Sequence, residues 1–169
     1  IEGDTTNLYG AYDASYDDVH NVLIVAASYG HKLAVVSVEN PRSMSILGKT
    51  IADTTYMNEP VGVCIDANNS FAYVTGYASS TFAVVSYADQ SSPARVGKID
   101  ADSTYFNYPL VTSQGCDVEN KRVVVAGYSS DSIAIVDVSD PTAPYRTGGL
   151  LLNSVTEPSG CGPWGTAYD

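Results

Sequence analysis

The sequence predicts an all-β fold made of four-stranded antiparallel sheets, arranged as the blades of a β-propeller. First, an apolar segment at 33–38 returns at 82–87 and at 133–138, with spacings of 49 and 51 residues. Second, each repeat contains short runs in which apolar and polar residues alternate, separated by residues typical of turns. Third, no apolar stripe with helical spacing continues for the length of a helix. Repeats of about 50 residues built from short strands are typical of propeller blades.

The second repeat shows the four strands most clearly. They are predicted at 61–65, 71–75, 82–86 and around 95–99. The third of these is apolar almost throughout, as expected for a strand that neighbouring blades cover on both faces. The fourth carries charges and a glycine, which suit an outer edge strand that must resist pairing with other chains.

The other two repeats follow the same order. In the third repeat the first strand ends at Cys116-Asp117, and the others are predicted at 122–126, 133–138 and 147–151. In the first repeat Asp13 is aligned with Asp117, so the connection 14–21 is expected to be longer than its counterparts. An Asp that ends a first strand is expected to accept hydrogen bonds from the amides of the following turn. The residues at this position are Asp13, Asp66, Asp117 and Asp169.

The chain is interpreted as a single propeller segment, 1–169, with three complete blades and partial flanking strands. The blades are predicted at about 8–52, 61–101 and 112–152, and 163–169 is predicted to begin a further blade. Because propellers typically have four to eight blades, three cannot close a ring. We expect a segment of a six- to eight-bladed propeller that packs on the remainder of its own propeller. Protomers that complete one another's rings are the alternative.

The strands resemble a known family of repeats. The run from Tyr128 to Pro144, with Val124–Gly127 ahead of it, is similar to the LVIVD repeat. The second repeat keeps the segment 73–77 but has Ser86 in place of the motif Asp, and the first has Ser37 there. The resemblance implies a propeller that acts as a binding or scaffold module. It also implies an extracellular or cell-surface location, because such repeats occur in secreted and surface proteins.

Charge and hydropathy exclude several partners. The chain has 8 Lys and Arg against 19 Asp and Glu, a formal charge of −11. Such a surface repels phosphate backbones and anionic lipid, so no nucleic-acid partner is expected. No apolar stretch is long enough to predict a membrane span.

One face is predicted to bind a partner. The connections from a fourth strand to the next first strand, 53–60 and 102–109, are long and similar, and 152–164 is longer still. They are expected to lie beside the loops that follow the second strands, which contain Tyr29, Tyr77 and Tyr128. Tyr, Asn and Thr side chains combine rigid contact area with adaptable hydrogen bonding. The candidate binding residues are Tyr56, Asn58, Tyr77, Tyr105, Asn107, Tyr128 and Trp164. Alternatively, Tyr56 and Tyr105 fill gaps between blades.

The function predicted is therefore a non-enzymatic binding or scaffold module for a protein partner, without a cofactor. No nucleophile, phosphate-loop or zinc-protease motif is present. Asp13, Asp17 and Asp18 are weak calcium candidates, because they supply oxygens but no loop with a central glycine. The alternative function is a carbohydrate-binding or glycan-processing propeller that uses the same face, with calcium.

The three cysteines show no zinc-type spacing. Cys64 and Cys116 lie at nearly the same place in successive repeats, in the strand predicted to be innermost. Buried free Cys commonly packs as a small apolar residue, so we expect structural thiols. A disulfide that involves Cys161 is the alternative.

Overall fold

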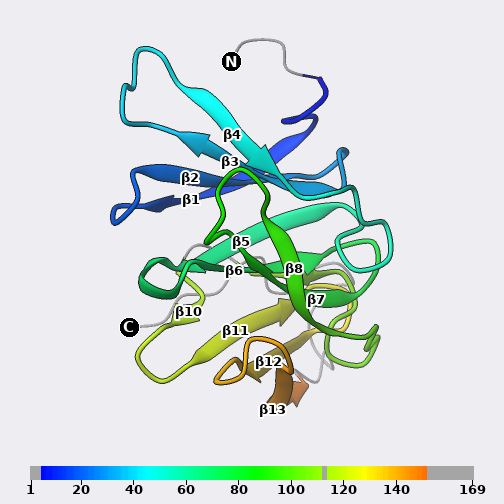
Figure 1. The fold of residues 1–169 in the computed structure, drawn as a ribbon. Coiled ribbons are helices and arrows are strands. Elements are labelled where there is room, and N and C mark those ends of the chain that lie inside the picture. Colours follow the sequence, from blue (N-terminus) through cyan, green and yellow to red (C-terminus); the bar gives the residue numbers. More distant parts are fainter. Residues whose placement is uncertain (1–4, 112–113, 152–169) are drawn as a thin grey trace.

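The computed structural model describes residues 5–111 and 114–151, which form three antiparallel sheets stacked in chain order (Figure 1). Sheet 1 contains β1 (Ala11–Asp17), β2 (Val22–Ala27), β3 (Lys32–Ser37) and β4 (Ser45–Lys49). Sheet 2 contains β5 (Pro60–Asp66), β6 (Phe71–Gly76), β7 (Thr81–Ser86) and β8 (Ala94–Ile99). Sheet 3 contains β9 (Pro109–Leu110), β10 (Cys116–Asp117), β11 (Arg122–Gly127), β12 (Ser132–Asp137) and β13 (Tyr145–Leu151). The predicted all-β fold with four-stranded sheets is confirmed.

Each sheet is a meander in which consecutive strands are hydrogen-bonded neighbours. In sheet 3 the innermost position is divided, since β9 and β10 both pair with β11. The only helical segment in the part of the chain that is described is a single 3-10 turn, Ala67–Asn69, in the connection between β5 and β6. The strand bounds predicted for the second repeat are confirmed to within a residue or two.

The predicted long connection in the first repeat is wrong. β1 continues to Asp17, and Tyr16 pairs with Leu23 of β2, so the turn is only 18–21. The corresponding turns are 67–70 and 118–121. Asp17, and not Asp13, is therefore the counterpart of Asp66 and Asp117. The sequence hid this strand because its residues are small or polar where its counterpart β5 is apolar.

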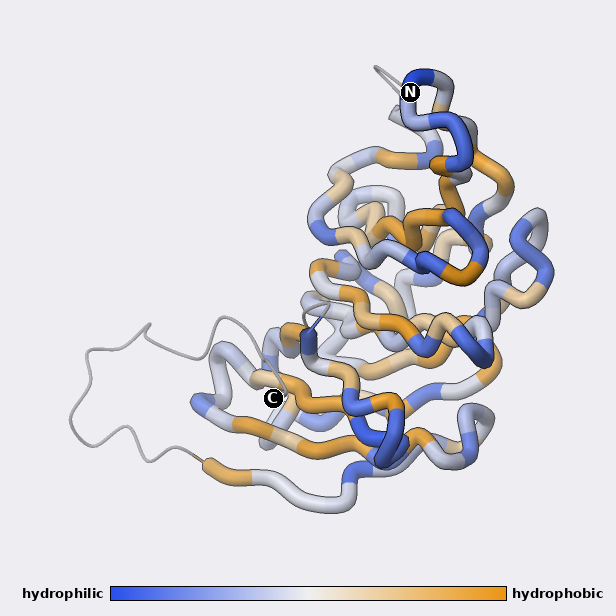
Figure 2. Tube along the Cα trace, turned by 90° about the vertical axis from the view of Figure 1, so that its left-hand side faces the viewer, coloured by the Kyte–Doolittle hydropathy of each residue, from blue (hydrophilic) through white to orange (hydrophobic). Residues whose placement is uncertain are grey.

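Two apolar layers hold the stack together, and they lie inside it (Figure 2). Between sheets 1 and 2, the layer includes Val22, Ile24, Leu33, Val35, Val63, Val74, Val85 and Tyr87. Between sheets 2 and 3, it includes Cys64, Tyr73, Phe82, Val84, Val123, Val125 and Val136. Because side chains on a strand alternate between its two faces, every buried strand must be apolar on both.

Equivalent residues occupy equivalent places in the three sheets. Leu33 and Phe82 are buried against the following sheet. Ile133 pairs with Ala126, just as Leu33 pairs with Ala26, and it is half-buried on the face of sheet 3 that points away from sheet 2. The repeat in sequence is thus a repeat in three dimensions.

The loops form two opposite faces (Figure 1). The connection face, at the right of the view, contains 53–59 and 102–108 together with the loops after β2, β6 and β11. The turn face, at the left, contains the turns 18–21, 67–70 and 118–121. Binding groups on one face are therefore separated from those on the other by the length of the strands.

Candidate functional site

Backbone hydrogen bonds join the loops of the connection face. In sheet 2, Tyr77 N donates to Glu59 O over 3.2 Å, and Ala78 N donates to Asn58 O over 3.1 Å. In sheet 3 the same pair of bonds runs from Tyr128 N to Tyr108 O and from Ser129 N to Asn107 O. This confirms the predicted neighbourhood of the two kinds of loop. It also gives Asn58 and Asn107 a backbone role.

The bonded loops hold their residues in fixed and unusual backbone conformations. Glu59 and Tyr108 have φ angles of 51° and 48°, and Gly10 at the same place in sheet 1 has φ 69°. Left-handed backbone is uncommon for residues with a Cβ. The surrounding hydrogen bonds therefore determine where the Tyr108 side chain can point.

A group of tyrosines gathers on this face. The rings of Tyr77 and Tyr108 are 4.7 Å apart between centroids. Burial, followed by the electrostatic effects of Tyr108, Tyr128 and Tyr12, raises the pKa of Tyr77. Tyr12 is 65% exposed and Tyr108 is 42% exposed, whereas Tyr77 and Tyr128 are half-buried. We call these four residues the tyrosine group.

Sequence reasoning found only half of the tyrosine group. Tyr12 lies where the pairing of β1 with β2 is irregular, and such a bulge leaves no signal in an alternating pattern. Tyr108 occupies the repeat position of Gly10 and Glu59, a place without a repeated aromatic residue. Tyr29 is not the counterpart of Tyr77, because Ser28 occupies that position, and its ring instead lies 5.4 Å from that of Tyr9.

Tyr56 and Tyr105 are half-buried against the fourth strand of the blade that their connections enter. Arg95 and Lys98 of β8 lie 4.3 and 4.5 Å from the centroid of the Tyr56 ring. Arg146 of β13 lies 3.9 Å from that of Tyr105. Such contacts contribute about 0.5–1 kcal/mol where exposed. The two rings therefore cover an outer strand.

Asp53 fixes the turn that carries Tyr56. Its Oδ1 accepts bonds from the amides of Thr55 and Tyr56, both at 3.0 Å, and its Oδ2 accepts from Arg95 Nε at 2.9 Å. Burial raises the pKa of Asp53, but the bonds from Tyr56 and Arg95 outweigh it and the net pKa is lowered. Asp53, Tyr56 and Arg95 line a pocket of about 400 Å³ beside β8.

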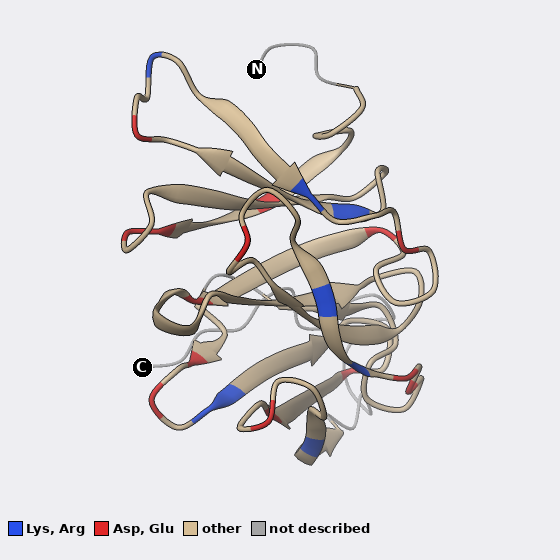
Figure 3. Cartoon of the chain, viewed as in Figure 1, with Lys and Arg blue, Asp and Glu red and all other residues tan. Residues whose placement is uncertain are grey.

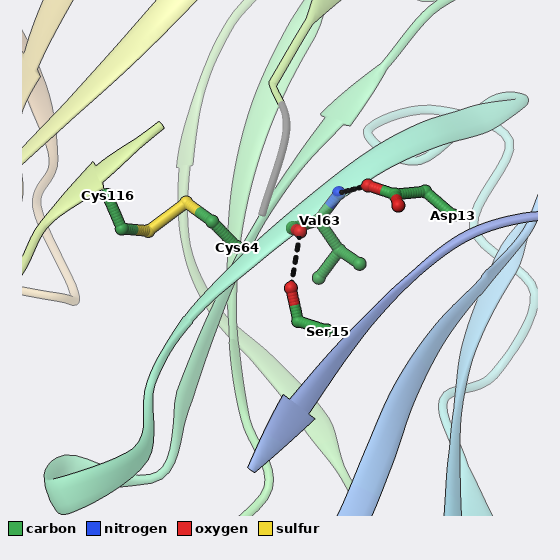
Figure 4. The surroundings of a disulfide bond; sticks show 5 residues. All are labelled: Asp13, Ser15, Val63, Cys64 and Cys116. Carbon is green, nitrogen blue, oxygen red and sulfur yellow. Dashed lines mark hydrogen bonds between the residues drawn. A yellow bond between two sulfur atoms is a disulfide. The ribbon is translucent and has the colours of Figure 1, made fainter. Parts of the chain in front are cut away.

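The Asp residues that end first strands bind the following turns, as predicted for Asp66 and Asp117. Asp66 Oδ1 accepts from Asn69 N, and Asp117 Oδ1 accepts from Asn120 N, both over 3.2 Å. In sheet 1 this role belongs to Asp17, which accepts from the amides of Val19 and His20. The prediction for Asp13 is wrong, because its Oδ2 accepts from Val63 N of sheet 2 (Figure 4).

The weak calcium candidates do not come together. Asp13 is bonded to Val63 N, Asp17 is buried beside His20 and Tyr87, and Asp18 is exposed on the turn. Within 5–111 and 114–151, no three His, Cys, Asp or Glu side chains gather in a metal-binding arrangement. Asp and Glu residues lie largely in turns and loops of the chain (Figure 3), where Asp stabilises local backbone.

The cysteine prediction is wrong: Cys64 and Cys116 form a disulfide between sheets 2 and 3 (Figure 4). Cys64 lies two residues before Asp66, whereas Cys116 lies one residue before Asp117. Because side chains alternate along a strand, this difference of one residue turns the two sulfurs toward each other across the junction. Their Cα atoms are 5.8 Å apart. The alternative partner, Cys161, lies outside the described residues.

Other predictions also fall outside the described residues: Trp164, the connection 152–164, Asp169 and the further strand at 163–169. No helix in the part of the chain that is described is long and apolar enough to cross a membrane.

No protein-family model matches the sequence, and no curated protein matches it. Solved structures do match. A putative 6-phosphogluconolactonase from Bacteroides uniformis is 14% identical with a TM-score of 0.67, over 83% of this chain and 41% of that one. A hydrazine synthase from Kuenenia stuttgartiensis is 16% identical with a TM-score of 0.60, over 86% of this chain and 38% of that one. A chain of a nidogen–laminin complex is 12% identical with a TM-score of 0.58, over 84% of this chain and 49% of that one.

These likenesses show the fold and not an activity. They establish a β-propeller module of at least three stacked sheets. The chain spans less than half the length of each of the three proteins.

Proposed function

We propose that this chain is a non-enzymatic propeller module of the LVIVD type that binds a protein partner through its connection face, outside the cytoplasm. The observation that carries the proposal is the tyrosine group: three phenols on hydrogen-bonded loops and Tyr12 near the start of β1, with Tyr12 and Tyr108 well exposed. The neighbour from a nidogen–laminin complex supports protein partnering as a use of this fold.

The chemistry of the tyrosine group suits protein recognition. A tyrosine offers a large, rigid contact area with only two side-chain torsions, so little conformational entropy is lost on binding. Its hydroxyl group can donate or accept a hydrogen bond with a partner. Because the loops are already bonded to one another, the partner need not order them.

The disulfide supports the proposed location. Disulfides persist in oxidising compartments and are rare in the cytosol, where thiols are kept reduced. The Cys64–Cys116 bond joins two blades, with Cys64 buried and Cys116 partly buried, as expected for a structural disulfide. The resemblance to the LVIVD repeat supports the same location.

The proposal is tested by selecting peptides from a random library displayed on phage against the full chain. We expect selected peptides to bind the native chain and to lose at least about tenfold in affinity for a Tyr12→Ala, Tyr108→Ala double variant. Tyr16→Ala is the matched control, because Tyr16 is also an exposed phenol of β1 but lies near the turn face. Unfolding midpoints of the three proteins show whether the fold is kept.

A parallel glycan array, with and without a calcium chelator, examines the runner-up function. Peptides that bind the double variant as well as the native chain would refute the proposal. Glycan binding that the chelator abolishes would instead favour the carbohydrate-binding propeller.

A further inference from the structure

The junction between sheets 2 and 3 contains a pocket of about 330 Å³ that opens on the turn face. Its walls include Asp66, Asn69, Phe71, Tyr73, Lys121 and Val138. A pocket of this size is at the lower end of the range of small-molecule sites. It lies at the opposite ends of the strands from the tyrosine group, so it does not depend on the proposed function.

The polar wall of the pocket contains an ion pair in which the carboxylate is buried and the lysine is partly exposed. The Asp66 side chain is 2% exposed, and its Oδ2 accepts from Lys121 Nζ over 3.1 Å and from Asn69 Nδ2 over 2.8 Å. Lys121 has further N–H donors, since an ammonium group carries three. The wall therefore presents a carboxylate and a partly used ammonium group side by side.

Tyr73 supplies a further hydroxyl group. The residue is only 3% exposed, and its ring stacks on that of Phe82 with a centroid separation of 6.3 Å. Its hydroxyl makes no hydrogen bond to any residue in 5–111 or 114–151, although Tyr73 lines the pocket. Burial, and then the charge of Asp66, raises the pKa of Tyr73, so the hydroxyl keeps its proton. Because this hydroxyl is at the wall of the pocket, it can bond to a ligand that enters.

The junction between sheets 1 and 2 shows which chemical group fits at the position of the pocket. Asp17 is the counterpart of Asp66, and Tyr87 Oη donates to Asp17 Oδ2 over 2.9 Å. In sheet 3, Val138 occupies the position that Tyr87 has in sheet 2. The amide of Tyr87 donates to Ser70 O and that of Val138 donates to Lys121 O, and both acceptors end the turn after the first strand. The second junction thus lacks the phenol that closes the first.

The missing ring is only partly replaced. Phe71 and Tyr73 are larger than their counterparts Val22 and Ile24, so they take up some of the space. The pocket that remains has an aromatic wall, an apolar floor at Val138 and the polar groups of Asp66 and Lys121.

We propose that this pocket binds a phenolic hydroxyl group, such as the tyrosine side chain of a partner protein. The ring packs against Phe71 and Val138, in the role that Tyr87 has at the first junction. The hydroxyl group of the ligand bonds to the polar wall and to the Tyr73 hydroxyl.

The proposal is tested by titrating the full chain with p-cresol, which is the tyrosine side chain alone, and measuring binding by calorimetry. Val138→Tyr places a phenol of the chain itself in the pocket, and we expect it to weaken p-cresol binding at least about tenfold. Val38→Tyr is the matched control, because Val38 occupies the same repeat position in sheet 1. It is expected to bind p-cresol as the native chain does.

Two further comparisons identify the chemistry. Toluene has no hydroxyl group, and we expect it to bind at least about tenfold more weakly than p-cresol, since the polar wall stays unpaired. Tyr73→Phe removes one hydroxyl group from the pocket and is expected to weaken p-cresol binding severalfold. It also keeps the proposal testable if Val138→Tyr does not fold.

The outcomes are distinct. If N-acetyl-tyrosinamide and p-cresol each bind, a tyrosine of a partner protein is supported as the ligand. If only p-cresol binds, the proposed partner tyrosine is overturned and a free phenol is left as the ligand. Unchanged p-cresol affinity in Val138→Tyr, or equal binding of toluene, overturns the proposal. So does binding of a methyl glycoside where p-cresol does not bind.

Discussion

The two junctions between successive sheets have the same plan and different chemistry. At the innermost strands, side chains of β1 bond to the backbone of β5 in the first junction: Ser15 Oγ donates to Val63 O over 2.7 Å, and Asp13 Oδ2 accepts from Val63 N. In the second junction a covalent bond, Cys64–Cys116, takes this place (Figure 4). Innermost strands of different blades do not pair as a sheet, so side chains must link them.

The buried Asp of each junction is also satisfied in a different way. Asp17 accepts hydrogen bonds from His20 and Tyr87, whereas Asp66 is paired with Lys121 from the next blade. Both junctions therefore keep the Asp carboxylate as the hydrogen-bond acceptor, while the side chains that donate to it differ. An acceptor at the end of a strand is needed by its own turn, whereas the donor can come from any neighbour that reaches it.

The largest expected effect is the loss of the disulfide. A Cys64→Ala, Cys116→Ala double variant should lower the free energy of unfolding by about 2–4 kcal/mol, because the cross-link restricts the unfolded chain. Urea unfolding measures this difference. Ser15→Ala at the first junction is the control and should cost only about 1 kcal/mol, the usual contribution of one hydrogen bond. Equal losses of unfolding free energy in the two variants would show that the disulfide stabilises its junction no more than the hydrogen bond stabilises the other.

The next effect concerns the contact between the outer strand β8 and the connection from β12 to β13. A Cβ added to Gly97 in β8 would lie 2.0 Å from Pro141 O of sheet 3, whereas one added to Gly148 in β13 meets no atom within 4 Å. Gly97→Ala should therefore destabilise the chain by about 1–3 kcal/mol. Gly148→Ala should change its stability by less than about 0.5 kcal/mol.

Thermal unfolding of the two variants makes this comparison directly. A cost for Gly148→Ala as large as that for Gly97→Ala would contradict it, and would mean that another segment packs on β13.

The smallest effect is the acid sensitivity of the first junction. Burial raises the pKa of Asp17, but bonds from His20 and Tyr87 outweigh this and hold the pKa below its ordinary value of 3.8. A lowered pKa stabilises the fold above pH 3.8, and this stabilisation is lost as the pH falls through the folded-state value. Asp17→Asn should therefore flatten the dependence of unfolding free energy on pH below about pH 4.

Urea unfolding at several acidic pH values measures that slope. Asp18→Asn, which makes the same change in charge on the exposed neighbour, is the control. A slope that Asp17→Asn leaves unchanged would locate the acid sensitivity elsewhere.

The sequence by itself determined the repeat, the strand order and the apolar layers, because these depend on local alternation and on turn residues. Strand bounds in the second repeat needed no tertiary information. Asp66 ends β5 and Pro93 directly precedes β8, and both are residues that limit strands through local backbone effects. It also located two of the four members of the tyrosine group, Tyr77 and Tyr128, which follow a strand at a repeated position.

Only the tertiary structure decided which residues meet across a junction. The disulfide depends on a difference of one residue between Cys64 and Cys116, and that difference has meaning only once two sheets face each other. Likewise, Tyr87 closes the first junction and Val138 leaves the second one open. Local pattern determines which face of a strand is buried, but the partner on the other side comes from a segment about fifty residues away.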